Sequence, residues 1–293
     1  MLNGFSESEA FAVRSLDGFV LPKKSDTLHK GSNGHLFSIV GCRQYQGAAT
    51  LSTEAALRGG CGIVSVFVPA SIYLPLASKV DSAIIHSCPE NEFGMFSAEF
   101  LDKFNIEIKN RKPNAILLGC GIGRQDANSK IVSFVLEQKI NCVVDGDGLW
   151  YLNDTILQNR ESDTILSPHI AEFAGMLNVE ISAVLNDRFA LCKDYAIKNR
   201  CVLVLKDSST TITAPDGKQW MLTAANPGMA KGGSGDVLAG LIASFLAQGF
   251  ESTQAALAGV WFHSAAGKLA AELFGEYAML PSDVISKLPF VLR

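Results

Sequence analysis

Short apolar runs alternate with longer segments of helical periodicity, and this alternation limits the fold more than any other feature of the chain. The apolar runs cover residues 36–41, 62–68, 114–119, 142–144, 164–166 and 202–205. The helix patterns lie at 48–59, 97–110, 127–139, 170–178 and 181–199. Short continuous apolar runs are typical of strands that are buried on both faces. Strands that alternate with helices predict an α/β fold, with a mostly parallel sheet between two layers of helices.

The last third of the chain completes the same domain. We expect a shorter β region at about 208–223, around the turn 215–217, and then helices at about 235–247 and 253–272. The sequence contains no repeat, linker or low-complexity tract. The predicted organisation is therefore a single domain at 28–293, preceded by an N-terminal extension at 1–27.

Composition argues against several classes of function. The 293 residues are 48% hydrophobic and 18% charged, and the net charge of −4 argues against a nucleic-acid-binding surface. The seven cysteines form no CxxC pair, so they predict neither a zinc site nor a disulfide framework. The N-terminus lacks a signal-peptide pattern, and polar residues interrupt the apolar region 237–262. We expect a cytoplasmic protein without a membrane span.

The strongest chemical signal is a glycine-rich segment, residues 226–236, directly before an apolar helix. Four of its eleven residues are glycine, which lets backbone N–H groups approach a ligand closely. The free amides of a helix N-terminus suit a phosphate group. Asp236 lies at this helix start, where it could act as a general base on a hydroxyl next to the phosphate. The alternative is a glycine-rich turn in which Asp236 only caps the helix.

Two more glycine-containing loops follow predicted strands. One contains Tyr45 and Gly47 and leads into a helix, and the other is the GxGxG run that ends at Gly123. Such sheets bind ligands in the loops outside the carboxyl ends of their strands. A tight crossover turn explains the second loop equally well, and the run lacks the form of the dinucleotide-binding fingerprint.

Polar side chains follow three other predicted strands. Asp145 and Asp147 could hold Mg²⁺ through water or bind hydroxyls, although Asp147 could equally be a helix cap. His169 lies in a strand-to-helix loop, where a capping role is the alternative to ligand binding, and Glu172 could simply complement the helix dipole. Lys206 ends a buried strand beside hydroxyl residues and could reach nucleotide phosphates, or it could be a solvated strand end.

Taken in order, these segments resemble the ADP/ATP-dependent NAD(P)H-hydrate dehydratases of the ribokinase-like superfamily. The resemblance covers about residues 28–290. It rests on segments 29–34, 45–60, 119–123 (GPGLG in the family), 145–149 (DADAL), 167–172 (TPHPGE), 206–210 (KGxxT) and 226–236. It implies a ribokinase-like fold. It also implies ADP- or ATP-dependent dehydration of hydrated NADH or NADPH, with Mg²⁺ bridging the phosphates and no direct protein ligand to the metal.

The resemblance also implies roles for individual residues, with Asp236 as the catalytic base. The hydrated dinucleotide would bind at Ala49, Gly123, His169 and Asp236. The nucleotide would bind at Lys206, Asp207, Ser208, Ser209, Thr210 and Gly235. Supporting roles would fall to Tyr45, Gly47, Asp145, Glu172, Asn226 and Gly233. A homo-oligomer, specifically a tetramer, is implied as well. Many members carry an N-terminal epimerase domain that the short segment before the match cannot contain, so any NAD(P)HX epimerase would be a separate partner.

The chain departs from the family pattern at several positions. Asp207 replaces a glycine, and a carboxylate beside a phosphate site is unfavourable unless it points away or engages a metal. The other departures are Cys120, Gly146, Gly148, Ser167, Ile170 and Ala171. Two alternative functions follow. One is a vitamin or hydroxyethylthiazole-type kinase of the same superfamily, and the other is a nucleotide-binding regulatory protein without catalysis.

Overall fold

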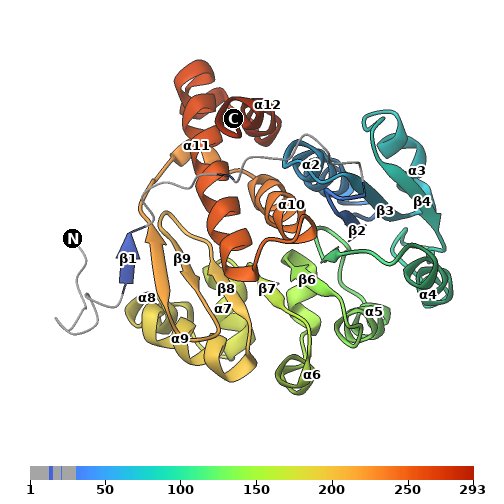
Figure 1. Ribbon diagram of the computed structural model, residues 1–293, viewed down its shortest axis with the longest axis horizontal. Coiled ribbons are helices and arrows are strands. Elements are labelled where there is room, and N and C mark those ends of the chain that lie inside the picture. Colours follow the sequence, from blue (N-terminus) through green and yellow to red (C-terminus); the bar gives the residue numbers. More distant parts are fainter. Residues whose placement is uncertain (1–12, 16–20, 22–30) are drawn as a thin grey trace.

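The computed structural model describes residues 13–15, 21 and 31–293, and it contains a ten-stranded sheet with helices on both faces (Figure 1). The strand order is β1-β10-β9-β8-β7-β6-β5-β2-β3-β4. Neighbouring strands from β8 to β4 are parallel, and β9 is antiparallel to both of its neighbours. The predicted α/β fold with a mostly parallel sheet is confirmed. The family-like segment that opens at residue 29 is described only from Gly31 onward.

The strands follow the apolar runs closely. Their bounds are β1 (Val13–Ser15), β2 (His35–Ile39), β3 (Ile63–Pro69), β4 (Ile84–Cys88), β5 (Ala115–Leu118), β6 (Asn141–Val144), β7 (Thr164–Leu166), β8 (Val202–Leu205), β9 (Thr210–Thr213) and β10 (Gln219–Leu222). All residues of β2, β5, β7 and β8 are buried, which explains why these strands read as continuous apolar runs. The edge strand β4 is largely exposed, so its pattern is weaker and the sequence did not predict it.

The helices confirm most predicted segments but divide one of them. Their bounds are α2 (Gln46–Arg58), α3 (Ala70–Ala77), α4 (Phe100–Arg111), α5 (Ala127–Leu136), α6 (Asp154–Asn159), α7 (Ile170–Leu177), α8 (Ile181–Asn186), α9 (Arg188–Asn199), α10 (Ser234–Ala247), α11 (Ser252–Ala278) and α12 (Pro281–Val291). The single helix predicted at 181–199 is wrong, because Asp187 leaves the helical conformation and separates α8 from α9. Helices α3, α6 and α12 were not predicted.

Helix α10 runs through the interior, and its packing fixes the position of the glycine-rich segment. Every residue of α10 from Val237 to Ala247 is buried. At Gly240 a Cβ atom would lie 2.2 Å from the carbonyl oxygen of Ser52, so glycine permits the close approach of α10 to α2. The apolar stretch is thus a core helix. No helix in the described part of the chain is long and apolar enough to cross a membrane.

Candidate active site

The glycine-rich segment forms a tight loop that ends at the N-terminus of α10. Gly233 adopts a φ of 101°, and a Cβ there would lie 2.5 Å from Leu51 Cδ1, so this position requires glycine. Asn226 accepts a hydrogen bond from the amide of Gly228 and donates one to the carbonyl of Gly267, which ties the loop to α11. Because the N-cap position belongs to Gly233, the alternative of Asp236 as a helix cap is wrong.

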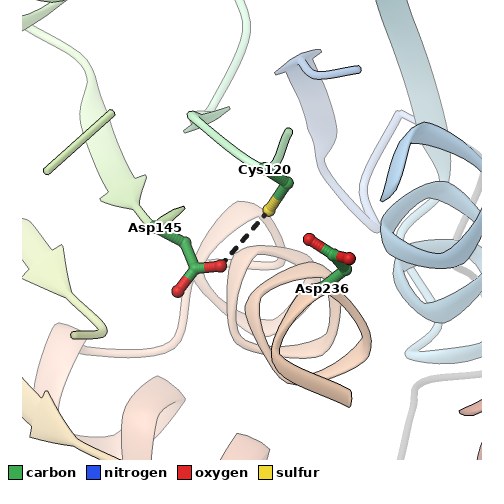
Figure 2. A group of neighbouring side chains, drawn as sticks. All are labelled: Cys120, Asp145 and Asp236. Atoms are coloured by element: carbon green, nitrogen blue, oxygen red, sulfur yellow. Dashed lines mark hydrogen bonds between the residues drawn. The ribbon is translucent and has the colours of Figure 1, made fainter. Parts of the chain in front are cut away.

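A second group of polar side chains surrounds Asp145, which follows β6 and is almost fully buried. The Lys206 Nζ lies 2.5 Å from Asp145 Oδ1, and the Ser167 hydroxyl donates to the same oxygen at 2.7 Å. The Cys120 thiol donates to Asp145 Oδ2 at 3.6 Å, and the Asp236 carboxylate lies beside this pair (Figure 2). Loops after β5, β6, β7 and β8 and the start of α10 therefore meet at one point, at the carboxyl ends of the parallel strands.

The neighbouring groups change the pKa of Asp236. Burial, and then the nearby Asp145 carboxylate, raise the pKa of Asp236 to about 7, while the Lys206 ammonium opposes the shift. Burial tends to lower the pKa of Lys206, but the carboxylates of Asp145 and Glu172 outweigh it and leave that pKa raised. Asp236 can therefore exchange a proton near neutral pH while Lys206 stays charged, as a general base requires.

A cavity of about 650 Å³ opens beside the start of α10. One side is the glycine-rich loop with Gly233 and Gly235, and the opposite side is the β8–β9 connection that begins at Lys206. The remaining lining residues are His169, Ile170, Ala171, Asp207, Ser208, Thr210, Leu222, Ala224, Asn226, Met229, Ala230, Lys231, Gly232, Ser234, Leu238, Val260, His263 and Ser264. Free helix-terminal amides and a lysine face a cavity with an apolar inner wall, which suits a nucleotide. Of the predicted nucleotide-binding residues, Ser209 does not line it.

His169 caps a helix, and it also lines the cavity. Its Nδ1 accepts the amide hydrogen of Glu172, and Glu172 accepts the amide hydrogen of His169, so the two residues form a reciprocal cap of α7. The imidazole is still 55% exposed and lines the cavity. Glu172 is only 11% exposed and holds His169 at the cavity edge. A β-bridge pairs His169 with Lys206 there.

The other predicted substrate residues, Ala49 and Gly123, do not line this cavity. The amide of Gly123 donates to Asp147 Oδ2 at 2.9 Å, so Asp147 braces this loop, and the predicted helix-capping alternative is wrong. Ala49 is fully buried in the core, and its contact with the hydrated dinucleotide stays a prediction. Tyr45 is half exposed in front of α2. A Cβ at Gly47 would meet no other atom, so no steric constraint requires a glycine there.

Comparison with known proteins identifies the family. The model of a family described as NAD(P)H-hydrate dehydratase matches residues 36–290. The chain belongs to this family. It is 35% identical to a bifunctional NAD(P)H-hydrate repair enzyme of Moorella thermoacetica, over 93% of this chain and 52% of that protein. A repair enzyme of the same name from Escherichia coli is 30% identical, over 97% of this chain and 52% of that protein. The chain thus spans about half the length of these curated relatives.

Solved structures of dehydratases have the same fold. The ADP/ATP-dependent NAD(P)H-hydrate dehydratase of Bacillus subtilis, co-crystallised with ATP and Mg²⁺, has a TM-score of 0.81 and 25% identity, covering 99% of this chain and 98% of that chain. A hydroxyethylthiazole kinase of Pyrococcus horikoshii has a TM-score of 0.58 at 14% identity, which shows a shared fold only. The predicted ribokinase-like fold and the predicted dehydratase family are therefore confirmed.

The residue that departs most from the dehydratase pattern, Asp207, is paired with a cation. Arg188 Nη2 lies 2.5 Å from Asp207 Oδ2, and Arg188 Nη1 donates to the Ser209 carbonyl at 3.2 Å. Arg188 is only 14% exposed. The sequence suggested that a carboxylate here would repel phosphates. The structure instead shows its charge neutralised and used to hold the β8–β9 connection.

Replacing Arg188 with alanine is expected to weaken ADP binding about fivefold, because Asp207 would then face the cavity unpaired. The double variant R188A/D207N should recover most of that affinity, and titration calorimetry would measure both. Lys198→Ala removes a cation from the exposed pair with Asp154 and serves as the matched control. Equal affinities for wild type and R188A would show that the Asp207 charge does not reach the ligand.

The described residues include one group that could ligate a metal: Cys120, Asp145 and Asp236, with ligand atoms within 4.8 Å of one another. Mg²⁺ prefers oxygen ligands and retains several waters. Cys120 offers a thiol whose pKa burial raises well above its usual value, and Asp145 is already paired with Lys206. These donors therefore do not fit a Mg²⁺ site built from protein ligands alone.

Two residues of the site carried no recognisable signal in the sequence. Arg188 begins α9, which was predicted as part of one longer helix at 181–199. The sequence therefore gave no indication that Arg188 lies beside Asp207. His263 lies in the apolar helix α11 and looks like an ordinary core residue, yet it lines the cavity. A polar residue within an apolar helix was the only signal available.

Proposed function

We propose that this protein dehydrates hydrated NADH or NADPH and drives the step by hydrolysis of ADP or ATP. The observation that carries the proposal is the carboxylate of Asp236, whose pKa is raised to about 7. It lies one residue beyond the cavity-lining turn Gly233–Gly235. Asp236 follows the cavity-lining Gly235, and its carboxylate lies within 4.8 Å of the thiol of Cys120, in the loop that ends at Gly123. Membership in the dehydratase family supports the same reaction.

The chemistry requires one proton acceptor and one phosphoryl donor. Asp236 would take the proton of the hydroxyl on the hydrated nicotinamide ring as this oxygen attacks the terminal phosphoryl group of the nucleotide. The new oxygen–phosphorus bond forms as the bond to the leaving AMP or ADP breaks. Loss of a ring proton then re-forms the carbon–carbon double bond and expels phosphate. Backbone amides at Gly233 and Gly235 would stabilise the charge on the transferring group.

Further features belong to the same proposal. The one candidate metal group in the described part of the chain does not suit Mg²⁺ as its sole ligands, and we propose that the ion binds together with the nucleotide phosphates. We also propose an NAD(P)HX epimerase as a functional partner. We also propose a cytoplasmic location and a tetramer. In this proposal His169 contacts the hydrated dinucleotide, and Lys206–Thr210 contact the nucleotide. Residues 28–293 would form the catalytic domain.

The proposal is tested by incubating the protein with hydrated NADH and either ADP or ATP. We expect the near-ultraviolet absorbance of NADH to return only when the nucleotide is present. A kinase of the same superfamily would instead phosphorylate hydroxyethylthiazole and leave hydrated NADH unchanged. A regulatory protein would bind nucleotide and do neither.

The raised pKa of Asp236 predicts the pH dependence of kcat/KM. A general base must be deprotonated, so kcat/KM should rise with pH and reach half its maximum near pH 7. Asp145→Asn removes a neighbouring negative charge, which lowers the pKa of Asp236 and should move the half-maximum to lower pH. The exposed residue Asp216 provides the control variant D216N, with an unchanged profile. A profile that does not move in D145N would show that Asp236 is not the titrating group.

A further inference from the structure

Two residues that line the cavity each carry a buried polar side-chain atom that has no hydrogen-bond partner among the described residues. These atoms are Oγ of Ser234, at the start of α10, and Nε2 of His263, on α11. His263 is only 9% exposed, and both residues line the same cavity. A buried polar atom without a partner is unfavourable, so such atoms in a cavity wall point to a ligand that supplies the missing partner.

The surroundings of His263 determine what its free nitrogen can bind. The ring contacts the backbone of Ser234 by a hydrogen bond that favours its protonated nitrogen. Because Nε2 has no partner, we assign this contact, and the proton, to Nδ1. Burial and then the positive charge of Lys206 lower the pKa of His263 to about 4, so the imidazole is neutral at pH 7. Its Nε2 therefore carries a lone pair and can only accept a hydrogen bond.

This requirement selects one part of a nucleotide. Phosphate oxygens accept hydrogen bonds and would face the lone pair of Nε2 unfavourably, so the phosphates fit the lysine and amide side of the cavity instead. The apolar wall formed by Leu222, Leu238 and Val260 suits the base. His263 lies one helical turn beyond Val260, and the charge of Lys206 acts on its ring, so we place His263 between the apolar and the charged ends of the cavity. The group that joins base to phosphates is the ribose, and its hydroxyls are donors.

We propose that His263 accepts a hydrogen bond from a ribose hydroxyl of the nucleotide and thereby positions the co-substrate against the N-terminus of α10. This role rests on the proposed function, because it assigns the cavity to ADP or ATP. It makes His263 a nucleotide-positioning residue that selects ribonucleotides over deoxyribonucleotides.

The test pairs a protein variant with a ligand variant. Titration calorimetry measures the affinity of wild type, H263L and H263Q for ADP, 2′-deoxy-ADP and 3′-deoxy-ADP. Losing one neutral hydrogen bond should weaken ADP binding to H263L about three- to tenfold. Wild type should show a similar loss for one of the two deoxy analogues. H263L should bind that analogue as well as it binds ADP, since the bond is already gone.

Two controls separate this role from an effect on folding. The amide oxygen of H263Q can accept the same hydrogen bond, so H263Q should retain most of the preference for ADP. His86 is another histidine whose Nε2 lacks a partner, but it lies on the edge strand β4, stacks on Phe67 and does not line this cavity. H86L should therefore bind all three nucleotides like wild type.

The outcomes distinguish this proposal from the proposed function. If ADP binds but the losses from H263L and from the deoxy analogue simply add, His263 does not contact the ribose, while the nucleotide site stands. If wild type discriminates against neither analogue, the role of His263 is overturned in the same way. If wild type binds neither ADP nor ATP, both proposals fail.

Discussion

Asp236→Asn is expected to lower the rate of turnover by about 10²- to 10⁴-fold while ADP affinity stays close to that of wild type. Asparagine keeps the size and polarity of the side chain but cannot accept a proton from the ring hydroxyl. The amides at Gly233 and Gly235 and the ammonium of Lys206 remain in place, so the nucleotide keeps its contacts. Steady-state kinetics gives the first quantity and titration calorimetry the second.

The stability of D236N separates loss of chemistry from loss of fold. The folded protein holds the pKa of Asp236 above its value in the unfolded chain, so ionising this carboxylate at neutral pH destabilises the fold. D236N should therefore unfold at an equal or higher denaturant concentration than wild type. The matched control is D216N, at the exposed turn between β9 and β10, which should leave both turnover and stability unchanged. Turnover of D236N within about tenfold of wild type would rule out an essential base at this position.

Replacing Lys206 with methionine is expected to lower the free energy of unfolding by about 3–5 kcal/mol. The carboxylate of Asp145 is only 4% exposed, and it would be left buried without its cationic partner. Methionine has a similar length, so the loss would come from the missing charge and not from a cavity. Denaturant unfolding at neutral pH measures the change.

A double variant isolates this electrostatic effect. In K206M/D145N both charges are gone, so most of the lost stability should return, although nucleotide affinity should not. The control K218M breaks the exposed pair with Asp216 and should change stability by less than about 1 kcal/mol. A similarly small change in K206M would show that Asp145 does not depend on Lys206.

Much of the site could be predicted because the sheet is parallel. Asp145, His169 and Lys206 each follow a buried apolar strand, and these parallel strands end at the same edge of the sheet. Their placement at the carboxyl ends of the strands therefore needed only the correct identification of β6, β7 and β8. The glycine-rich turn was equally readable, because Gly233 has a positive φ that other residues rarely adopt.

The pairings within the site could not be predicted from the sequence. Lys206 is 61 positions away from Asp145, and whether it faces this carboxylate or the cavity depends on side-chain packing. The sequence analysis considered Lys206 as a ligand of nucleotide phosphates, and the structure shows that Lys206 also forms a buried ion pair with Asp145. Arg188, at the start of α9, similarly neutralises Asp207 in the β8–β9 connection. Ala49 was placed on the substrate by resemblance alone, and its depth in the core could not be read from its motif.

The most direct test of the account is the amount of phosphate released for each NADH recovered from its hydrate. The proposed mechanism couples one dehydration to one phosphoryl transfer through Asp236, so purified protein with ATP should yield equal amounts of NADH and phosphate. D236N should yield neither above background. Recovery of NADH without phosphate release, or phosphate release that does not depend on hydrated NADH, would contradict the account.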